Sequence, residues 1–322
     1  MPSIVTHHYF AYDVLNALPS SIQNVITPSK KIYDIFAQSF DNLFYYQFFT
    51  PWKGQKIRSL GNLAQQTKVN EYFKNILDYI VENNYENNSE VLAYLYGSIC
   101  HYVLDSLCHP YIIYLSGDVN KDLKYRGNHE KIETSLDAYI YQKKEKQELK
   151  KATLANTLLP ICNFSKPLQE TINNAFYKTF SAPNMALKYE KSYKVGHFIL
   201  KYFVTDKKGI KKRLYTIKDA ITKKSHRKYE YLSFHIDNTK KIYVNLNHKT
   251  WHHPVTNEPY NDSFLDLYNQ SIKEATNKIK AIDKYLNTNK KDLQKLLKII
   301  GNNSYTTGLD CLQKQTLKYF QN

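Results

Sequence analysis

The stretch VLAYLYGSICHYVLDSLCHPYIIYL, residues 91–115, is the longest apolar passage of the chain and constrains the fold most. Its length suits a membrane-spanning helix. However, His101, Asp105 and His109 interrupt it, and ionisable groups are costly on a lone helix in lipid. Spaced four apart, the three side chains follow one stripe of a helix and drift by about 40° per step, while apolar residues cover the other faces. We therefore predict a core helix whose polar stripe faces a polar centre.

A metal ion is the occupant that we favour for this centre, over hydrogen bonds between a buried helix and its neighbours. His101 and His109 lie about 12 Å apart along a helix axis. Both imidazoles would reach a single ion only with strain, because metal–nitrogen bonds are about 2 Å long. Two ions with Asp105 between them fit the spacing better. Pro110 disfavours α conformation at His109, so we expect the helix to end or kink there.

Asp41 is a carboxylate inside an aromatic run, SFDNLFYYQFF, and burying it without a partner would be expensive. A helix cap or a tyrosine hydroxyl would satisfy it, and so would a cation. The residues around Asp41 do not decide between these partners.

His129 and Glu133 are four residues apart in HEKIETSLDAYIYQKK, so they share a helix face. Alone, such a pair is best interpreted as an ordinary surface pair. After a helix with the His-Asp-His stripe, it becomes a candidate for the second half of a metal site. His248, His252 and His253 also invite a metal interpretation, but a packed loop explains them better.

Helical patterns dominate the chain, and we predict an all-α fold. We expect one domain over residues 1–322, with the metal-site core at about 1–150 and a helical part at about 151–322. The turn-rich segments 54–61 and 243–264 are expected to be loops, and KIYVNL (241–246) is the only strand candidate. Besides 91–115, the helical stretches are 6–18, 29–49, 62–84, 129–144, 157–180, 189–205, 264–282 and a last helix that ends before Gly301.

The chain is basic, with 45 lysines and arginines against 29 aspartates and glutamates and a formal net charge of +16. This charge favours anionic partners such as lipid headgroups, nucleic acid or phosphorylated substrates. Residues 206–228 are lysine-rich, and we interpret them as a solvated helix face rather than a headgroup-attracting patch. No basic run is interleaved with aromatic residues as densely as in nucleic-acid modules, so nucleic acid is the less favoured partner.

The four cysteines show no C-x-x-C pair and no framework spacing, so we expect reduced core residues. The start, MPSIVTHHYF, lacks the basic and apolar regions of a signal peptide. With residues 91–115 assigned to the core, no spanning segment remains. We therefore expect a cytoplasmic protein.

Four segments occur in the order typical of one family: THHYF, SFDNLFYY, YGSICHYVLDSLCHPYI and GNHEKIETSLD. With them, the sequence resembles the bacterial zinc-dependent phospholipase C family, whose toxin members include the clostridial alpha-toxin. A later segment, NHKTWHHPVTNEPYNDSF, resembles family members without a signal peptide. The resemblance extends from about residue 4 to residue 290. It implies a bundle of helices that holds one to three zinc ions.

The resemblance also implies a ligand set. His7 is preferred to His8 because Thr-His-x-x-Phe aligns with the start of the family. In this set His7 binds one ion, and Asp105 bridges that ion to a second. Asp41 and His101 complete the shell of the second ion. The remaining ion is held by His109, His129 and Glu133.

The sequence departs from the family pattern at two places. Many relatives have a further histidine after the segment of Asp41, where Gln65 stands here. Secreted relatives use the amine of the mature N-terminus as a ligand, whereas six residues precede His7 in this chain.

The resemblance implies metal-assisted hydrolysis of a phosphodiester, with Asp41 as the group that accepts or orients the proton of the attacking water. The substrate would be a phospholipid or another phosphodiester, with peripheral membrane contact through the basic surface. The aromatic residues near Asp41 suit a lipid-facing pocket or core packing equally. Two alternatives remain: a nuclease, since fungal single-strand nucleases share this fold and ligand plan, and a non-catalytic, metal-stabilised helical binding protein, which Gln65 favours. The sequence leaves the headgroup and the oligomeric state open.

Overall fold

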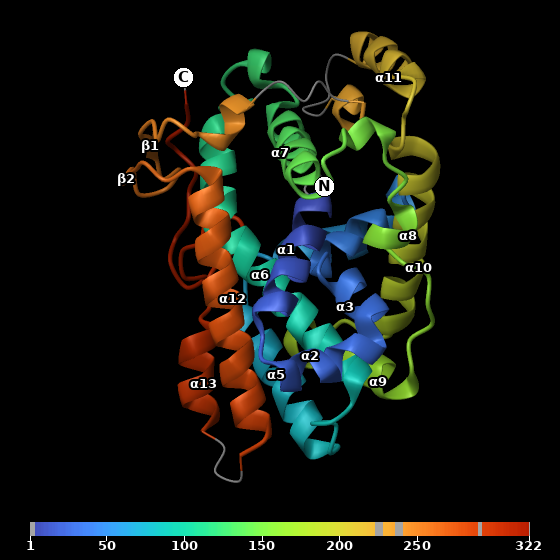
Figure 1. Ribbon diagram of the computed structural model, residues 1–322, viewed down its shortest axis with the longest axis vertical. Helices are drawn as coiled ribbons and strands as arrows, with labels where there is room; N and C mark the ends of the chain where they lie inside the picture. The colour runs from blue at the N-terminus through green and yellow to red at the C-terminus, as the bar shows by residue number, and fades with distance from the viewer. Residues whose placement is uncertain (1–3, 223–227, 236–240, 289–291, 322) are drawn as a thin grey trace.

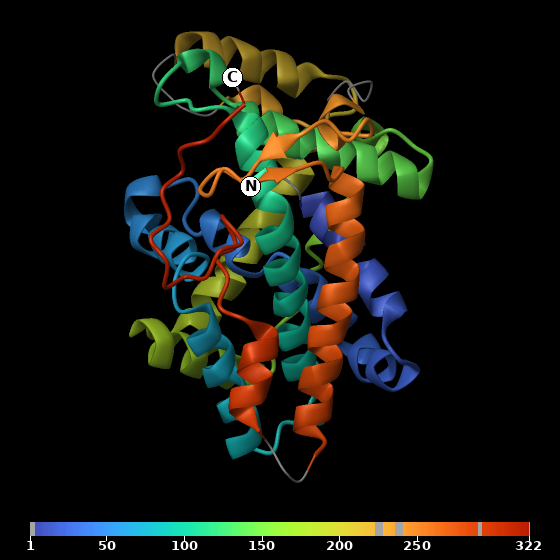
Figure 2. The same ribbon diagram turned by 90° about the vertical axis from the view of Figure 1, so that its left-hand side faces the viewer.

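The computed structural model describes residues 4–222, 228–235, 241–288 and 292–321. The fold is a bundle of helices around α6 (Ser89–Ser116), which runs through the middle of the molecule in both views (Figures 1 and 2). Helix α6 packs most extensively on α1 (Ile4–Ala17), α3 (Lys30–Phe36), α7 (Asn128–Glu145) and α12 (Phe264–Leu286). The prediction of an all-α fold is confirmed.

Helix α6 is buried along almost its whole length because apolar side chains cover most of its surface. The Asn88 side chain caps its start by accepting a hydrogen bond from the Val91 N–H. Among the residues that the structure describes, α6 is the one helix long and apolar enough to cross a membrane, and 94% of its most apolar window is buried in the fold. Such burial is typical of a core helix.

The helix does not end at His109, as the following proline led us to expect, but continues through Pro110 to Ser116. Pro110 has no N–H, so the carbonyl of Ser106 loses its usual helical partner. The backbone of Gly308, in the C-terminal segment, lies so close to this oxygen that a side chain there would collide with it. Tertiary packing therefore holds the helix together across the proline.

The N-terminal part is more broken than we predicted. Helix α1 spans Ile4–Ala17 and α2 spans Ser20–Ile26. The expected helix 29–49 is instead α3 (Lys30–Phe36) followed by the 3-10 turn η2 (Ser39–Tyr45), because Ser39 has a φ of 29° and breaks the helical path. Asp41 thus lies on a 3-10 turn.

Residues 54–61, expected to form a loop, lie inside helix α4 (Pro51–Ala64). The glycines that suggested a loop have a packing role, because a side chain at Gly54 would collide with the carbonyl of Tyr46 and one at Gly61 would crowd the carbonyl of Phe40. The chain then turns at Lys68, which has a φ of 56°, so the predicted helix 62–84 is divided and its second part is α5.

The remaining helices follow the predicted stretches, with a break between α8 and α9 around Pro160. Their bounds are Val69–Glu82 (α5), Asn128–Glu145 (α7), Ala155–Leu158 (α8), Lys166–Phe180 (α9), Met185–Ile199 (α10), Ile210–Ile221 (α11), Phe264–Leu286 (α12) and Leu293–Ile300 (α13). Shorter turns are η1 (Thr27–Ser29), η3 (Leu123–Tyr125), η4 (Leu149–Lys151), η5 (Leu200–Val204) and η6 (Tyr229–Leu232). Residues 223–227 of the lysine-rich stretch lie outside the described residues.

The strand prediction was wrong. Lys241–Val244, within KIYVNL, forms the 3-10 turn η7. A short antiparallel hairpin lies instead in the segment expected to be a loop, where β1 (Trp251–His252) pairs with β2 (Pro259–Tyr260). Ser263 then starts α12 with a capping box, in which its side chain accepts from the Asp266 N–H and the Asp266 carboxylate accepts from the Ser263 N–H.

Candidate metal centre

Asp105 lies at the centre of a chain of histidine contacts on the polar stripe of α6. Its Oδ2 atom is 3.2 Å from His101 Nε2, one turn earlier on the same helix. Its Oδ1 atom is 3.1 Å from His7 Nε2 and 3.6 Å from His109 Nδ1. The two carboxylate oxygens therefore face different neighbours, as a carboxylate shared between two sites would.

The first group of potential ligands is His7, His101 and Asp105, whose ligand atoms lie within 4.8 Å of one another. All three side chains are buried, and the two imidazole rings stack with 4.4 Å between their centroids. The neighbouring His8 projects from another side of α1 and takes no part. Its Nδ1 atom lies 3.7 Å from the carboxylate of Asp34 on α3.

The second group is His109, His129 and Glu133, which bring α6 and α7 together. The Nε2 atoms of both histidines lie 3.2 Å from the same oxygen, Glu133 Oε1. Glu133 is buried, whereas the side chain of His129 is 39% exposed. Solvent therefore reaches the second group through His129, while the first group is enclosed.

Hydrogen bonds fix the orientation of three of these imidazoles. His101 Nδ1 donates to the carbonyl of Ala37 over 3.2 Å, and His109 Nδ1 donates to the carbonyl of Tyr305 over 3.0 Å. His129 Nδ1 lies 3.3 Å from Ser116 Oγ, and that hydroxyl donates its own proton to Ile112, so it accepts from His129. Each Nε2 atom is then left with a lone pair, which is the usual arrangement for a histidine that binds a metal through Nε2.

Four buried atoms in the two groups have no hydrogen-bond partner among the described residues: His7 Nδ1, His101 Nε2, Asp105 Oδ2 and Glu133 Oε2. Unsatisfied polar atoms at such a depth are costly, and few occur without a reason. Three of the four belong to the enclosed first group. Imidazole nitrogens and carboxylate oxygens are ligands that zinc takes, so a cation at each group fits the residues present.

The charges of the centre support the same conclusion. Burial would raise the pKa of the Asp105 carboxyl, but His109, His101 and His7 hold that pKa well below its usual range. Burial likewise opposes the lowered pKa of Glu133, which His129 and His109 hold down. Burial lowers the pKa of His109, yet Asp105 and Glu133 outweigh it and raise this pKa to about 10. Without a metal the His109 imidazole therefore carries a second proton on Nε2, which zinc would displace on binding. The carboxylates therefore remain ionised and attract positive charge to the centre.

Asp41 lies beside the first group rather than within it. Its Oδ1 atom is 3.9 Å from His101 Nε2, and Gln65 Nε2 donates a hydrogen bond of 2.6 Å to the same oxygen. Gln65 thus occupies the position next to Asp41 that its alignment with a family histidine implies. The amide nitrogen supplies a proton there and has no lone pair for a metal.

Two contributors to the centre were missed in the sequence. Asp137, one turn beyond Glu133 on α7, accepts hydrogen bonds from the N–H groups of Val5 and Thr6 at 3.2 and 2.8 Å and so fixes the start of α1 next to His7. The spacing His129, Glu133, Asp137 was a signal that could have found it. Tyr305 is 196 residues from His109, and no local pattern points to it.

The histidines of the segment 248–253 belong to no ligand group among the described residues. His253 Nε2 bonds the carbonyl of Thr307 at 2.8 Å, and its Nδ1 accepts from the backbone of Val255 and Thr256. Packing of the loop accounts for this histidine, as we expected.

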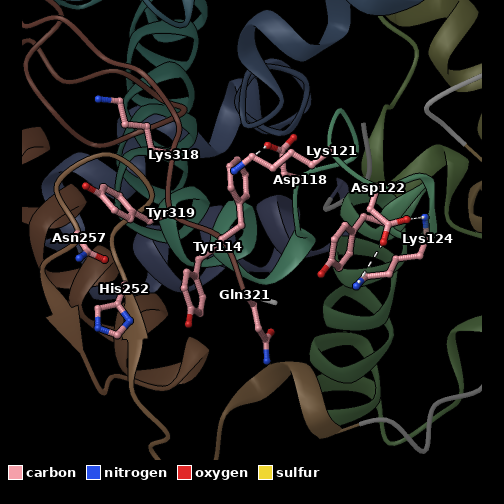
Figure 3. Close-up of a pocket in the computed structure, with 12 residues that line it drawn as sticks. Tyr114, Asp118, Lys121, Asp122, Lys124, His252, Asn257, Lys318, Tyr319 and Gln321 are labelled. Carbon is pink, nitrogen blue, oxygen red and sulfur yellow. Dashed lines mark hydrogen bonds and ion pairs between the residues drawn. The ribbon is translucent and has the colours of Figure 1, made fainter.

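A polar pocket of about 500 Å³ lies between the end of α6, the hairpin and the C-terminal segment (Figure 3). Tyr114 and Asp118, which flank Ser116, line it together with Lys121, Lys124 and Lys318. The described residues that line it include none of the seven predicted ligands. Ser116, which lies between Tyr114 and Asp118 in the chain, accepts a hydrogen bond from His129 of the second ligand group.

A family model described as zinc dependent phospholipase C matches residues 6–190, more than half of the chain. The chain belongs to this family. All seven predicted ligands lie within the matched residues, whereas Tyr305 belongs to the part that follows them. No curated protein and no solved structure matches the chain. Membership of a zinc-dependent family, with two candidate ligand groups in the core, supports a zinc phosphodiesterase.

Proposed function

We propose that this zinc-dependent phospholipase C family member is an active phosphodiester hydrolase, with phospholipids as its substrates. The observation that carries the proposal is the position of Asp105, whose two oxygens face His101 on one side and His7 and His109 on the other. Asp105 therefore connects the buried ligand group to the group of His109, which is open to solvent. A catalytic metal centre needs both firmly held ligands and a position open to solvent.

We assign one zinc ion to His109, His129 and Glu133, where three protein ligands leave an open position toward solvent. A second belongs to His7, His101 and Asp105. A third ion, beside Asp41, would be the weakest, because it would compete with the second for the one free nitrogen of His101 and because Gln65 offers Asp41 a hydrogen-bond donor in place of a ligand.

Zinc bound at these groups would polarise the phosphoryl oxygens and lower the pKa of a water molecule toward neutrality. The residues of the chain supply the rest. Asp41, held by the amide of Gln65, would orient the attacking water and accept its proton. The carbonyls of Ala37 and Tyr305 would keep His101 and His109 in their binding tautomers throughout the reaction.

Hydrolysis of a phosphatidylcholine analogue, measured with added zinc and with a chelator, tests the proposal. We expect zinc-dependent release of the phosphorylated headgroup. The rate of hydrolysis should fall at least about a hundredfold in the Asp41→Asn variant, which is the usual effect of removing a general base. Single-stranded DNA as a second substrate separates the two enzymatic alternatives. Cleavage of DNA without cleavage of lipid would assign a nuclease, and no hydrolysis of either by the zinc-loaded protein would leave the binding-protein alternative.

A further inference from the structure

Helix α11 (Ile210–Ile221) exposes an apolar stripe on the surface of the protein. Ile210, Leu214, Ile217 and Ile221 are 57%, 60%, 60% and 78% exposed. At about 100° per residue they fall within roughly 60° of one another around the helix axis. Large apolar side chains scattered singly on a surface are ordinary, but a continuous stripe of them marks an interaction site.

The opposite face of α11 fixes the helix so that the stripe points outward. Asp219 lies about 180° away from the stripe and is buried. Its carboxylate accepts hydrogen bonds of 2.8 and 2.9 Å from the N–H groups of Tyr229 and Glu230. The polar face of this amphipathic helix is thus turned toward the protein, the reverse of what a helix that completes the core would show.

Basic residues flank the stripe on both sides. Arg213 lies on one side and Lys218 on the other, both exposed, and Lys207 and Lys208 precede the helix, also exposed. The Nζ atom of Lys218 lies 3.8 Å from the ring centroid of Tyr229, at the foot of the helix. The surface therefore combines apolar side chains with positive charge. This composition differs from the solvated face that the lysine-rich sequence led us to expect, and it is typical of a helix that lies in the interface of an anionic membrane.

An exposed aromatic cluster adjoins α11 through the turn η5. Its members are Phe49, Phe198, Tyr202 and Phe203, with ring centroids 4.8–6.1 Å apart. The hydroxyl of Tyr215, on α11, donates a hydrogen bond of 3.0 Å to the carbonyl of Phe203 and ties the cluster to the helix. Aromatic side chains of this kind favour the headgroup region of a bilayer.

The helix is also connected to the metal centre. Arg126, three residues before His129, donates hydrogen bonds of 3.2 and 2.8 Å to the carbonyls of Asp219 and Thr222 at the end of α11. Figure 1 shows α11 at the upper right, at the same end of the molecule as α7. A surface bound by α11 would thus lie at the same end as the start of α7, which carries the exposed ligand His129.

We propose that the α11 stripe and the adjoining aromatic cluster form a docking surface for an anionic phospholipid bilayer. The positive charge on both sides of the stripe selects this occupant over an uncharged apolar partner. The inference builds on the proposed function, because it explains how a phospholipid would be brought to the enzyme, but docking itself needs no catalysis.

Sedimentation with vesicles tests it, with phosphatidylcholine vesicles compared with vesicles that also contain phosphatidylglycerol. The zinc-loaded full chain is expected to bind the anionic vesicles more tightly. The double variant Leu214→Gln, Ile217→Gln should bind both kinds at least about tenfold more weakly, since it removes two inserted side chains. Arg213→Gln should weaken binding about fivefold on the anionic vesicles alone.

Leu187→Gln, an equally exposed leucine near the start of α10, is the matched control and should bind as the wild-type protein does. Hydrolysis of dihexanoyl phosphatidylcholine, kept monomeric in solution, should be unchanged in all these variants. The proposal is overturned if the double variant sediments with vesicles as the wild-type protein does. It is also overturned if the only effect of the two substitutions is to convert a dimer to a monomer, because the stripe would then bind a second copy of the chain. Vesicle binding lost in the double variant, with no hydrolysis by any form, would support docking and contradict the proposed function.

Discussion

Replacing Gln65 by histidine is expected to strengthen zinc binding at Asp41 and to raise the rate of phosphodiester hydrolysis. The amide nitrogen of Gln65 lies 2.6 Å from Asp41 Oδ1, and His101 Nε2 lies 3.9 Å from the same oxygen. A neutral nitrogen ligand at position 65 would therefore join a carboxylate and an imidazole that already converge. The backbone of Gln65 is helical, so histidine is tolerated there.

The size of the effect follows from the ligand count. Removing a residue that only orients a ligand costs about 10–100-fold in metal affinity or activity. Supplying a missing ligand should gain at least that much, which corresponds to about 1.4–2.8 kcal/mol of binding free energy. Asp41 would also lose its donor from the amide, so its oxygen becomes available to the metal.

Competition with a zinc-sensitive dye measures the affinity, and hydrolysis of a phosphatidylcholine analogue measures the rate. Gln66→His is the control, because the neighbouring side chain is exposed and a histidine there adds surface affinity only. Zinc affinity and rate that are the same in Gln65→His and Gln66→His would refute the reasoning and remove Gln65 from the centre.

Two further predictions concern the support of the centre. Asp137→Ala should destabilise the protein by about 1–2 kcal/mol, because the start of α1 loses its cap, and it should also weaken zinc binding by His7. Thermal melts with zinc and with a chelator measure both effects. Equal melting temperatures of the variant and the wild-type protein would contradict this prediction. Burial lowers the pKa of His8 to about 4. Since this pKa lies below the unfolded value of about 6.5, the stability contributed by neutral His8 is complete above pH 6.5 and is lost as the pH falls toward 4, by up to about 3 kcal/mol. His8→Gln should remove this part of the acid sensitivity in denaturant titrations, and an unchanged pH dependence would show that His8 is not the group responsible.

The sequence predicted the features that depend on local spacing. The His101, Asp105, His109 stripe and the His129, Glu133 pair follow from the helical period, and the structure brings these residues into contact. Features that depend on contacts between distant segments could not be predicted. Gly54 and Gly61 suggested a loop because their role, close approach of α4 to η2, is visible only in the fold.

The continuation of α6 past Pro110 and the orientation of His109 have the same origin. Both depend on the C-terminal segment, which packs on α6 although it lies about 200 residues further along the chain. Gly308 packs against the carbonyl of Ser106, and the carbonyl of Tyr305 orients His109. The lysines in the segment of α11 suggested a solvated helix face, and both the apolar stripe and its outward direction were missed. The buried Asp219 decides that direction.

Zinc content is the most direct test of the central claim, that two ligand groups joined by Asp105 bind metal. We predict that the purified protein, dialysed against zinc, retains the metal, and that Glu133→Gln loses the ion of the exposed group while it keeps the buried one. Asp105→Asn should reduce both, because its carboxylate contacts His7, His101 and His109. A wild-type protein without zinc, or a zinc content unchanged in Glu133→Gln and Asp105→Asn, would contradict the account.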